Sequence, residues 1–151
     1  MDITTELSLE HAFDVRINFD KRWMFGPLPG GDKQGFTSVK DGQVEGPRLN
    51  GRVVEYSGAD WPIVRSDGVI ELQAHYVLEA SDGTQIYIRN LGYVHTGAGP
   101  IPGYFRCTPY FRAPDGPHGW LNHTVFVGLG QRRPATDDQP DHSLFRYYAV
   151  F

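Results

Sequence analysis

Apolar and polar residues alternate along two long stretches of the chain, and this pattern narrows the fold more than any other feature. Residues 7–19 and 69–80 both alternate with a period of two, which is the side-chain period of a β-strand. Asp67-Gly68 and Asp82-Gly83 follow or precede such stretches and are typical of tight hairpins. No segment has a sustained apolar period of 3.6 residues, so we expect an antiparallel all-β protein with little helix.

Short strands separated by turns predict a meander that closes into a barrel. The chain holds 18 Gly and 11 Pro in 151 residues, which suits many turns. We expect one domain, residues 1–151, forming a closed antiparallel β-barrel of about 8–10 strands, because closure removes exposed strand edges. A two-sheet sandwich is the alternative. Further strands are expected at residues 36–39, 61–65, 84–94, 104–113, 120–130 and 144–151, with a loop at 95–103.

The charge and the termini exclude several classes of protein. A net charge of −4 argues against a nucleic-acid surface, which needs clustered Lys and Arg. No stretch approaches the roughly 20 apolar residues of a membrane span. The first residues lack a basic segment followed by an apolar one, so no signal peptide is expected. With one cysteine, Cys107, no intrachain disulfide forms. We therefore expect a cytoplasmic protein that binds neither nucleic acid nor membrane.

Residues 45–61 read as a strand that is interrupted. Gly46, Pro47, Gly51 and Gly58 break its apolar pattern, and Gly and Pro inside strands indicate bulges, edges or bends. We expect this stretch to be the bend at which the barrel turns. It ends on a carboxylate beside an indole, Asp60-Trp61, and an apolar ring can raise a carboxyl pKa toward that of a general acid or base. The alternative is that Asp60 accepts backbone hydrogen bonds in a turn.

Polar residues on strands are candidates for a ligand site inside the barrel. We expect the following to point inward: Arg89, Arg106, Tyr87, Tyr104, Asn122 and Trp120. An inward Arg beside Tyr would bind a carboxylate, phenolate or enolate oxygen through charge-assisted hydrogen bonds. The alternative is that these side chains face solvent or form structural ion pairs.

Motifs for metals, nucleotides and covalent catalysis are missing from the sequence. The six His form no metal-binding spacing, and no glycine-rich phosphate loop occurs, so we expect no metal and no cofactor. Cys107 lies between Arg106 and Thr108, where the cation could activate it, but a buried inert thiol is the favoured interpretation.

Several short motifs, taken in order, resemble the domain-of-unknown-function 3237 family, also called the UPF 0311 family. The motifs are Glu45–Gly51, Gly58–Trp61, Arg65–Gly68, Tyr87–Asn90, Tyr104–Arg106, Trp120–Asn122 and Phe126–Gly130. The resemblance runs from about Leu9 to Phe151 and implies a closed, lipocalin-like β-barrel that often forms a homodimer. The resemblance implies no reaction. The polar and aromatic residues that lie at its motif positions are Arg48, Asp60, Trp61, Asp67, Arg89, Arg106, Trp120 and Asn122.

These observations lead to a first hypothesis, a cofactor-independent enzyme acting on a small carbonyl-bearing or aromatic metabolite. The reaction would be an isomerase, cyclase or lyase type proton transfer, with Asp60 as base, Arg89 and Arg106 stabilising an oxyanion, and Tyr87 or Tyr104 hydrogen-bonding to it. The substrate-binding residues would be Arg48, Trp61, Tyr76, Tyr104, Trp120 and Asn122.

A non-catalytic carrier of a small ligand is the second hypothesis. The third is an interaction protein, whose barrel would be filled by side chains.

Overall fold

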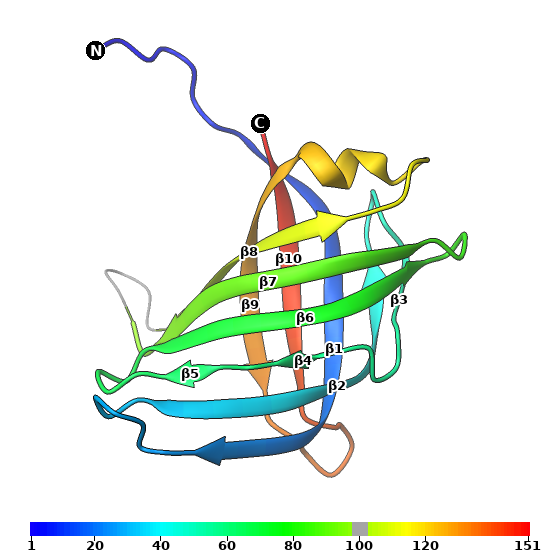
Figure 1. The fold of residues 1–151 in the computed structure, drawn as a ribbon. Coiled ribbons are helices and arrows are strands. Elements are labelled where there is room, and N and C mark those ends of the chain that lie inside the picture. Colours follow the sequence, from blue (N-terminus) through cyan, green and yellow to red (C-terminus); the bar gives the residue numbers. More distant parts are fainter. Residues whose placement is uncertain (98–102) are drawn as a thin grey trace.

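Antiparallel pairing runs around the whole molecule and closes a β-barrel (Figure 1). The computed structural model describes residues 1–97 and 103–151, so the middle of the expected loop at 95–103 lies outside the described residues. The strands are β1 (Leu9–Phe25), β2 (Lys33–Glu45), β3 (Gly51–Val53), β4 (Ala59–Asp60), β5 (Ile63–Val64), β6 (Ile70–Ala80), β7 (Gln85–His95), β8 (Tyr104–Arg112), β9 (Val125–Arg133) and β10 (His142–Val150). A short 3-10 helix, η1 (Gly119–His123), precedes β9.

Strand β1 closes the barrel because it pairs with β2 along one edge and with β10 along the other. The remaining neighbours follow chain order from β6 to β10. The short strands β3, β4 and β5 each pair with both β2 and β6, so together they fill one interrupted position between these two long strands. Counted this way, the described residues form eight positions around the barrel, which confirms the predicted fold class.

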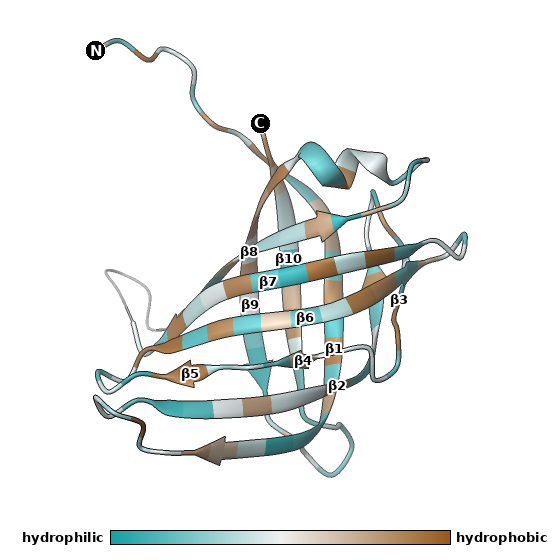
Figure 2. Ribbon diagram, in the orientation of Figure 1, coloured by the Kyte–Doolittle hydropathy of each residue, from teal (hydrophilic) through white to brown (hydrophobic). Residues whose placement is uncertain are grey.

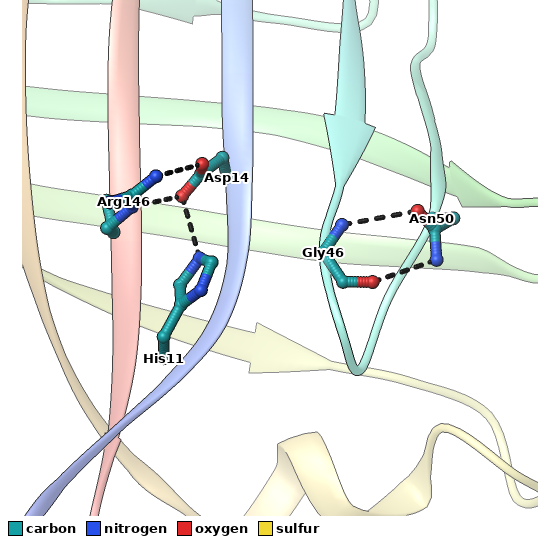
Figure 3. A network of polar contacts seen from close by, with 5 residues as sticks. All are labelled: His11, Asp14, Gly46, Asn50 and Arg146. Atoms are coloured by element: carbon teal, nitrogen blue, oxygen red, sulfur yellow. Dashed lines mark hydrogen bonds and ion pairs between the residues drawn. The ribbon is translucent and has the colours of Figure 1, made fainter.

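The interrupted position corresponds to the Gly-rich stretch 45–61. The expected interruption is observed: β2 ends at Glu45, and only the short strands β3 and β4 follow within this stretch. The bend between β2 and β3 is pinned by Asn50, which accepts a hydrogen bond from the Gly46 N–H at 3.2 Å and donates to the Gly46 carbonyl at 3.0 Å (Figure 3). The chain then passes so close to β6 that a Cβ on Gly58 would lie 1.7 Å from the His75 carbonyl oxygen.

Aromatic side chains fill one half of the barrel interior. The ring of Phe13 lies 5.7 Å from that of Phe111 and 5.6 Å from that of Tyr147, and Phe111 lies 5.1 Å from Phe126. All four residues are buried. Edge-to-face packing of this kind excludes water and stabilises this half of the interior.

Side chains along the long strands alternate between the interior and the surface, as expected. On β7 and β8, however, the face that points to the interior is the opposite of the one we predicted. Along β7, Ile86, Ile88 and Asn90 are buried, and hydrophobic and hydrophilic residues alternate (Figure 2). On β8, Cys107 and Phe111 are buried. The apolar residues therefore fill the core, and the Tyr and Arg residues between them point outward.

The expected strand at 120–130 begins later than predicted. Residues Gly119–His123 form η1, and β9 starts at Val125. Leu121 of η1 is buried, and Trp120 packs against the core, with its ring 5.6 Å from that of Phe126. The helix thus covers the aromatic-filled end of the barrel. Among residues 1–97 and 103–151, no helix has the length and apolar character needed to cross a membrane.

We predict that Gly58→Ala lowers the free energy of unfolding by about 3 kcal/mol or more, because a Cβ would collide with the rigid backbone of β6. Urea denaturation measures the change. Gly119→Ala is the control, since a Cβ there meets no atom within 4 Å. Equal stabilities of the two variants would contradict the close approach of these chain segments.

Candidate functional site

The other half of the barrel interior contains a cavity of about 200 Å³. Most of its wall is apolar, with side chains from β1, β2, β5, β6, β7, β8 and β10. The polar residues that line it are Arg22, Thr37, Asp60, Tyr76, Asn90, Arg132 and Ser143. A mostly apolar cavity with a few convergent polar groups is the usual form of a small-molecule site. Its presence argues against a barrel filled by side chains, as the interaction-protein hypothesis requires.

Asp60 is the acidic residue of this cavity wall. It lies on β4, where it pairs with Thr37 of β2 and Ala74 of β6, both buried, and it lines the cavity beside them. Burial raises the pKa of Asp60 to about 6, although the hydrogen bond from the Gln73 backbone N–H, at 3.0 Å, and the charge of Arg22 act in the opposite direction. A carboxyl with such a pKa is mostly ionised at neutral pH and can still accept a proton readily.

Two polar groups on the cavity wall lack partners among the described residues. They are the hydroxyl of Tyr76 on β6 and the side-chain oxygen of Asn90 on β7, and both side chains are 1% exposed. The Asn90 amide donates a hydrogen bond to the Tyr147 hydroxyl at 3.1 Å, which fixes its orientation. Burial raises the pKa of Tyr76 far above its usual value, so its hydroxyl stays neutral and acts as a donor. Buried polar groups are normally satisfied, so this pair of a donor and an acceptor suits a polar ligand.

Arg22 and Arg132 lie at the mouth of the cavity, and both pair with Asp141. Arg22 and Arg132 line the cavity, yet a third or more of each side chain is exposed to solvent. Arg22 donates to Asp141 Oδ2 at 2.7 Å, and Arg132 pairs with Asp141 Oδ1. Both guanidinium groups also lie within 6 Å of the Phe19 ring centre, at 5.9 and 5.4 Å.

Two of the residues predicted from sequence, Asp60 and Tyr76, line this cavity. Trp61 does not. Its side chain is exposed and packs against Phe36, with ring centres 4.7 Å apart, on the outer surface. The raised pKa of Asp60 therefore comes from burial in the barrel, and the expected contact with the neighbouring indole is absent because successive side chains along a strand point to opposite faces.

Arg89 and Tyr87 lie on the outer face of β7, so their predicted inward orientation is wrong. Arg89 is exposed, and the Tyr87 hydroxyl contacts His75 Nδ1 at 2.5 Å on the neighbouring strand. Ile86 and Ile88 occupy the interior positions instead. The strand is oriented so that its apolar side chains, Ile86 and Ile88, are buried in the core. Our prediction instead placed the polar side chains that could bind a substrate in the interior.

Arg106 and Tyr104 also face outward, contrary to our expectation. The Arg106 guanidinium lies 5.4 Å from the centre of the Tyr104 ring and donates to the Phe105 carbonyl at 3.0 Å. Both line an open outer groove of about 790 Å³ that also includes Tyr93 and Tyr148. They are therefore separated from the interior cavity by the sheet itself.

Arg48, Trp120 and Asn122 lie at the aromatic-filled end of the barrel and not in the cavity. The Arg48 guanidinium stacks over the Trp120 ring at 3.8 Å. The exposed Asn122 side chain accepts from the Ala113 N–H at 2.8 Å and donates to the Ala113 carbonyl at 2.9 Å. These contacts hold η1 on the barrel. Trp120 packs against the core but away from the cavity, and the inward orientation expected of Asn122 is wrong.

Sequence reasoning missed Asn90, Arg22 and Arg132. Asn90 shares its face with Ile86 and Ile88, and a polar residue on the apolar face of a strand was the available signal. Arg22 gave no such signal, because β1 contains register shifts between Asn18 and Arg22 that change which residues face inward.

Burial raises the pKa of the Cys107 thiol to about 12, so it stays protonated. Within the described part of the chain, no three His, Cys, Asp or Glu residues are grouped to hold a metal ion.

On the outer surface, Asp14 accepts hydrogen bonds from Arg146 at 2.8 and 2.9 Å and contacts His11 (Figure 3). The Arg146 hydrogen bond lowers the pKa of Asp14, which is therefore an ion-pair carboxylate and a poor general base.

The fold and the cavity define a closed β-barrel protein with a small interior site. The chain belongs to the family described as "Protein of unknown function (DUF3237)", whose model matches residues 7–150. Similar proteins include a UPF0311 protein of Clostridium acetobutylicum, 30% identical over 99% of both chains. Another, from Rhodopseudomonas palustris, is 27% identical over 86% of this chain and 92% of its own.

Solved structures share the barrel. The "beta-barrel like protein" of Acinetobacter baumannii AYE aligns with a TM-score of 0.87 at 26% identity, covering all of both chains. The protein of unknown function from Clostridium acetobutylicum aligns with a TM-score of 0.85 at 28% identity, covering 99% of this chain and 100% of its own. A structure called "an enzyme from Penicillium herquei" aligns with a TM-score of 0.75 at 19% identity, over 100% of this chain and 99% of its own; this likeness shows the fold alone.

The raised pKa of Asp60 predicts a specific dependence of stability on pH. The folded protein binds a proton at Asp60 more tightly than the unfolded chain does, so stability is lost as the pH rises from the unfolded pKa, 3.8, to the folded pKa, about 6. We predict that the stability of Asp60→Asn relative to wild type increases by roughly 2–3 kcal/mol over this interval and then levels off. Urea denaturation from about pH 4 to about pH 7 measures it.

Taking the difference between the two proteins removes the opposite contributions of Asp14 and Asp82, whose pKa values are lowered. Parallel stability profiles for wild type and Asp60→Asn would show that Asp60 has an ordinary pKa.

Proposed function

We propose that this protein is a cofactor-independent enzyme that moves a proton next to a carbonyl group of a small metabolite bound in the barrel. The reaction would be an isomerase, cyclase or lyase type step. The observation that carries the proposal is a carboxyl of pKa about 6 in the wall of a mostly apolar cavity that also holds the unpartnered Tyr76 hydroxyl and Asn90 oxygen. Perturbed carboxyls in cavities are typical of acid-base sites.

Each polar group has a role in the proposed step. Ionised Asp60 takes a proton from the carbon next to the substrate carbonyl, and the electron pair moves onto the carbonyl oxygen. The neutral Tyr76 hydroxyl donates a hydrogen bond to that oxygen and stabilises its negative charge. The Asn90 side-chain oxygen accepts a hydrogen bond from a hydroxyl or amine of the same molecule. Protonated Asp60 then returns its proton to another atom of the substrate.

The size of the cavity limits the substrate. At about 200 Å³ it is smaller than the roughly 300–1,000 Å³ of sites for drug-sized ligands. A small metabolite, or the reacting end of a larger one that extends through the mouth, suits this volume. The roles first expected for Arg89, Arg106 and Tyr87 are not part of the proposal, because the sheet lies between them and the cavity.

A carrier of small ligands is the second candidate, since an enclosed cavity with unpartnered polar groups would serve binding alone. The two functions differ in what happens to the ligand. When the proton on Asp60 exchanges with heavy water before it is returned, an enzyme of the proposed type labels its substrate with deuterium. A carrier returns its ligand unchanged.

We predict that the wild-type protein catalyses deuterium incorporation into at least one member of a panel of small ketones, enones and phenolic ketones in D₂O, detected by mass spectrometry. Asp60→Asn should lower the rate at least about tenfold, because a positioned base contributes roughly 10²–10⁴-fold. The wild-type rate should also rise as the pH increases through about 6, where Asp60 becomes ionised.

Asp138→Asn is the matched control, since it makes the same change at an exposed loop position and should leave the rate unaltered. An unchanged rate in Asp60→Asn would remove Asp60 from the mechanism. Binding of a panel compound without any exchange would support the carrier.

A further inference from the structure

Two cationic side chains lie at the mouth of the cavity. The guanidinium groups of Arg22 and Arg132 share the single carboxylate of Asp141. Arg22 also acts on Asp60 in the cavity wall, where its charge lowers the carboxyl pKa against the effect of burial. The two guanidinium groups are therefore the positive charges that an anion entering the cavity would meet.

Hydrogen-bond donors also remain available at the mouth. A guanidinium has five N–H donors. Among the described residues, Arg22 donates to Asp141 alone. Arg132 forms an ion pair with Asp141 and donates to the His142 carbonyl at 3.0 Å. Both groups line the cavity, so the free donors are placed where a bound molecule would meet them.

We propose that Arg22 and Arg132 form a subsite for the carboxylate of a monoanionic substrate, whose uncharged remainder lies in the cavity beside Asp60 and Tyr76. This inference rests on the proposed function for the place of the reacting atoms, but not for the binding of the anion. Guanidinium groups bind carboxylates through paired, charge-assisted hydrogen bonds.

The alternative is that the three residues only hold strand ends together. Arg22 lies on β1, Arg132 on β9, and Asp141 directly before β10, so their ion pairs bridge three strands. A purely structural role predicts that the arginines have no preference for carboxylate ligands. It also predicts that removing the Asp141 charge would not improve binding of any anion.

The test measures binding of two pairs of compounds, benzoate against benzamide and phenylacetate against phenylacetamide, by calorimetry or ligand-observed NMR. We expect at least one carboxylate to bind about tenfold tighter than its amide, and Arg22→Gln or Arg132→Gln to abolish most of that preference. Asp141→Asn should strengthen carboxylate binding about twofold to fivefold, because it removes the anion that competes for both arginines.

Arg133→Gln is the control, since Arg133 is the exposed neighbour of Arg132 on β9 and bonds to Gln131. If neither carboxylate is preferred over its amide, or if the preference survives in both arginine variants, the subsite is refuted. Asp60→Asn separates the two proposals, because it should lose deuterium exchange and keep the preference for carboxylates. A wild-type protein that prefers carboxylates but exchanges no deuterium leaves the subsite standing and refutes the enzyme. Exchange without carboxylate preference does the reverse.

Discussion

Pairing of β1 with both β2 and β10 closes the barrel, and every interior feature depends on that closure. An open sheet would leave Asp60, Tyr76 and Asn90 in water, where a carboxyl keeps its ordinary pKa and a hydroxyl finds water as a partner. Closure buries Tyr76 and Asn90 and leaves Asp60 only partly exposed. The low effective dielectric of the interior then raises the Asp60 pKa and makes the unpartnered groups costly without a ligand.

The interrupted strand position adds a second constraint. Gly51 and Gly58 let the chain approach β6 so closely that a side chain at either position would collide with a backbone carbonyl. Between them the sheet position is broken, and the two-residue strand β4 points Asp60 inward. The same residues that reduce the regularity of the sheet thus place a carboxyl among apolar neighbours. Local backbone irregularity and the site chemistry have one origin in the sequence.

The fold could be predicted from the sequence because alternation along 69–80 and the Asp-Gly turns are local signals, and the structure confirms the barrel. Asp60 and Tyr76 were also identified in advance, and both line the cavity. The orientation of Arg89 and Arg106 could not be judged from chemistry, because in a small barrel the apolar side of each strand faces the core. Arg22 and Arg132 could not be found at all, since they meet only where register shifts in β1 and the turn before β10 bring them to Asp141.

The account depends on the pKa of one carboxyl, that of Asp60, which burial raises to about 6. Carbon-13 NMR titration of the Asp60 side-chain carboxyl, assigned by its disappearance in Asp60→Asn, measures this property without knowledge of any substrate. The account predicts a midpoint of about 6. A midpoint near 3.8, the ordinary value for Asp, would show that the carboxyl is solvated and would contradict the proposed site.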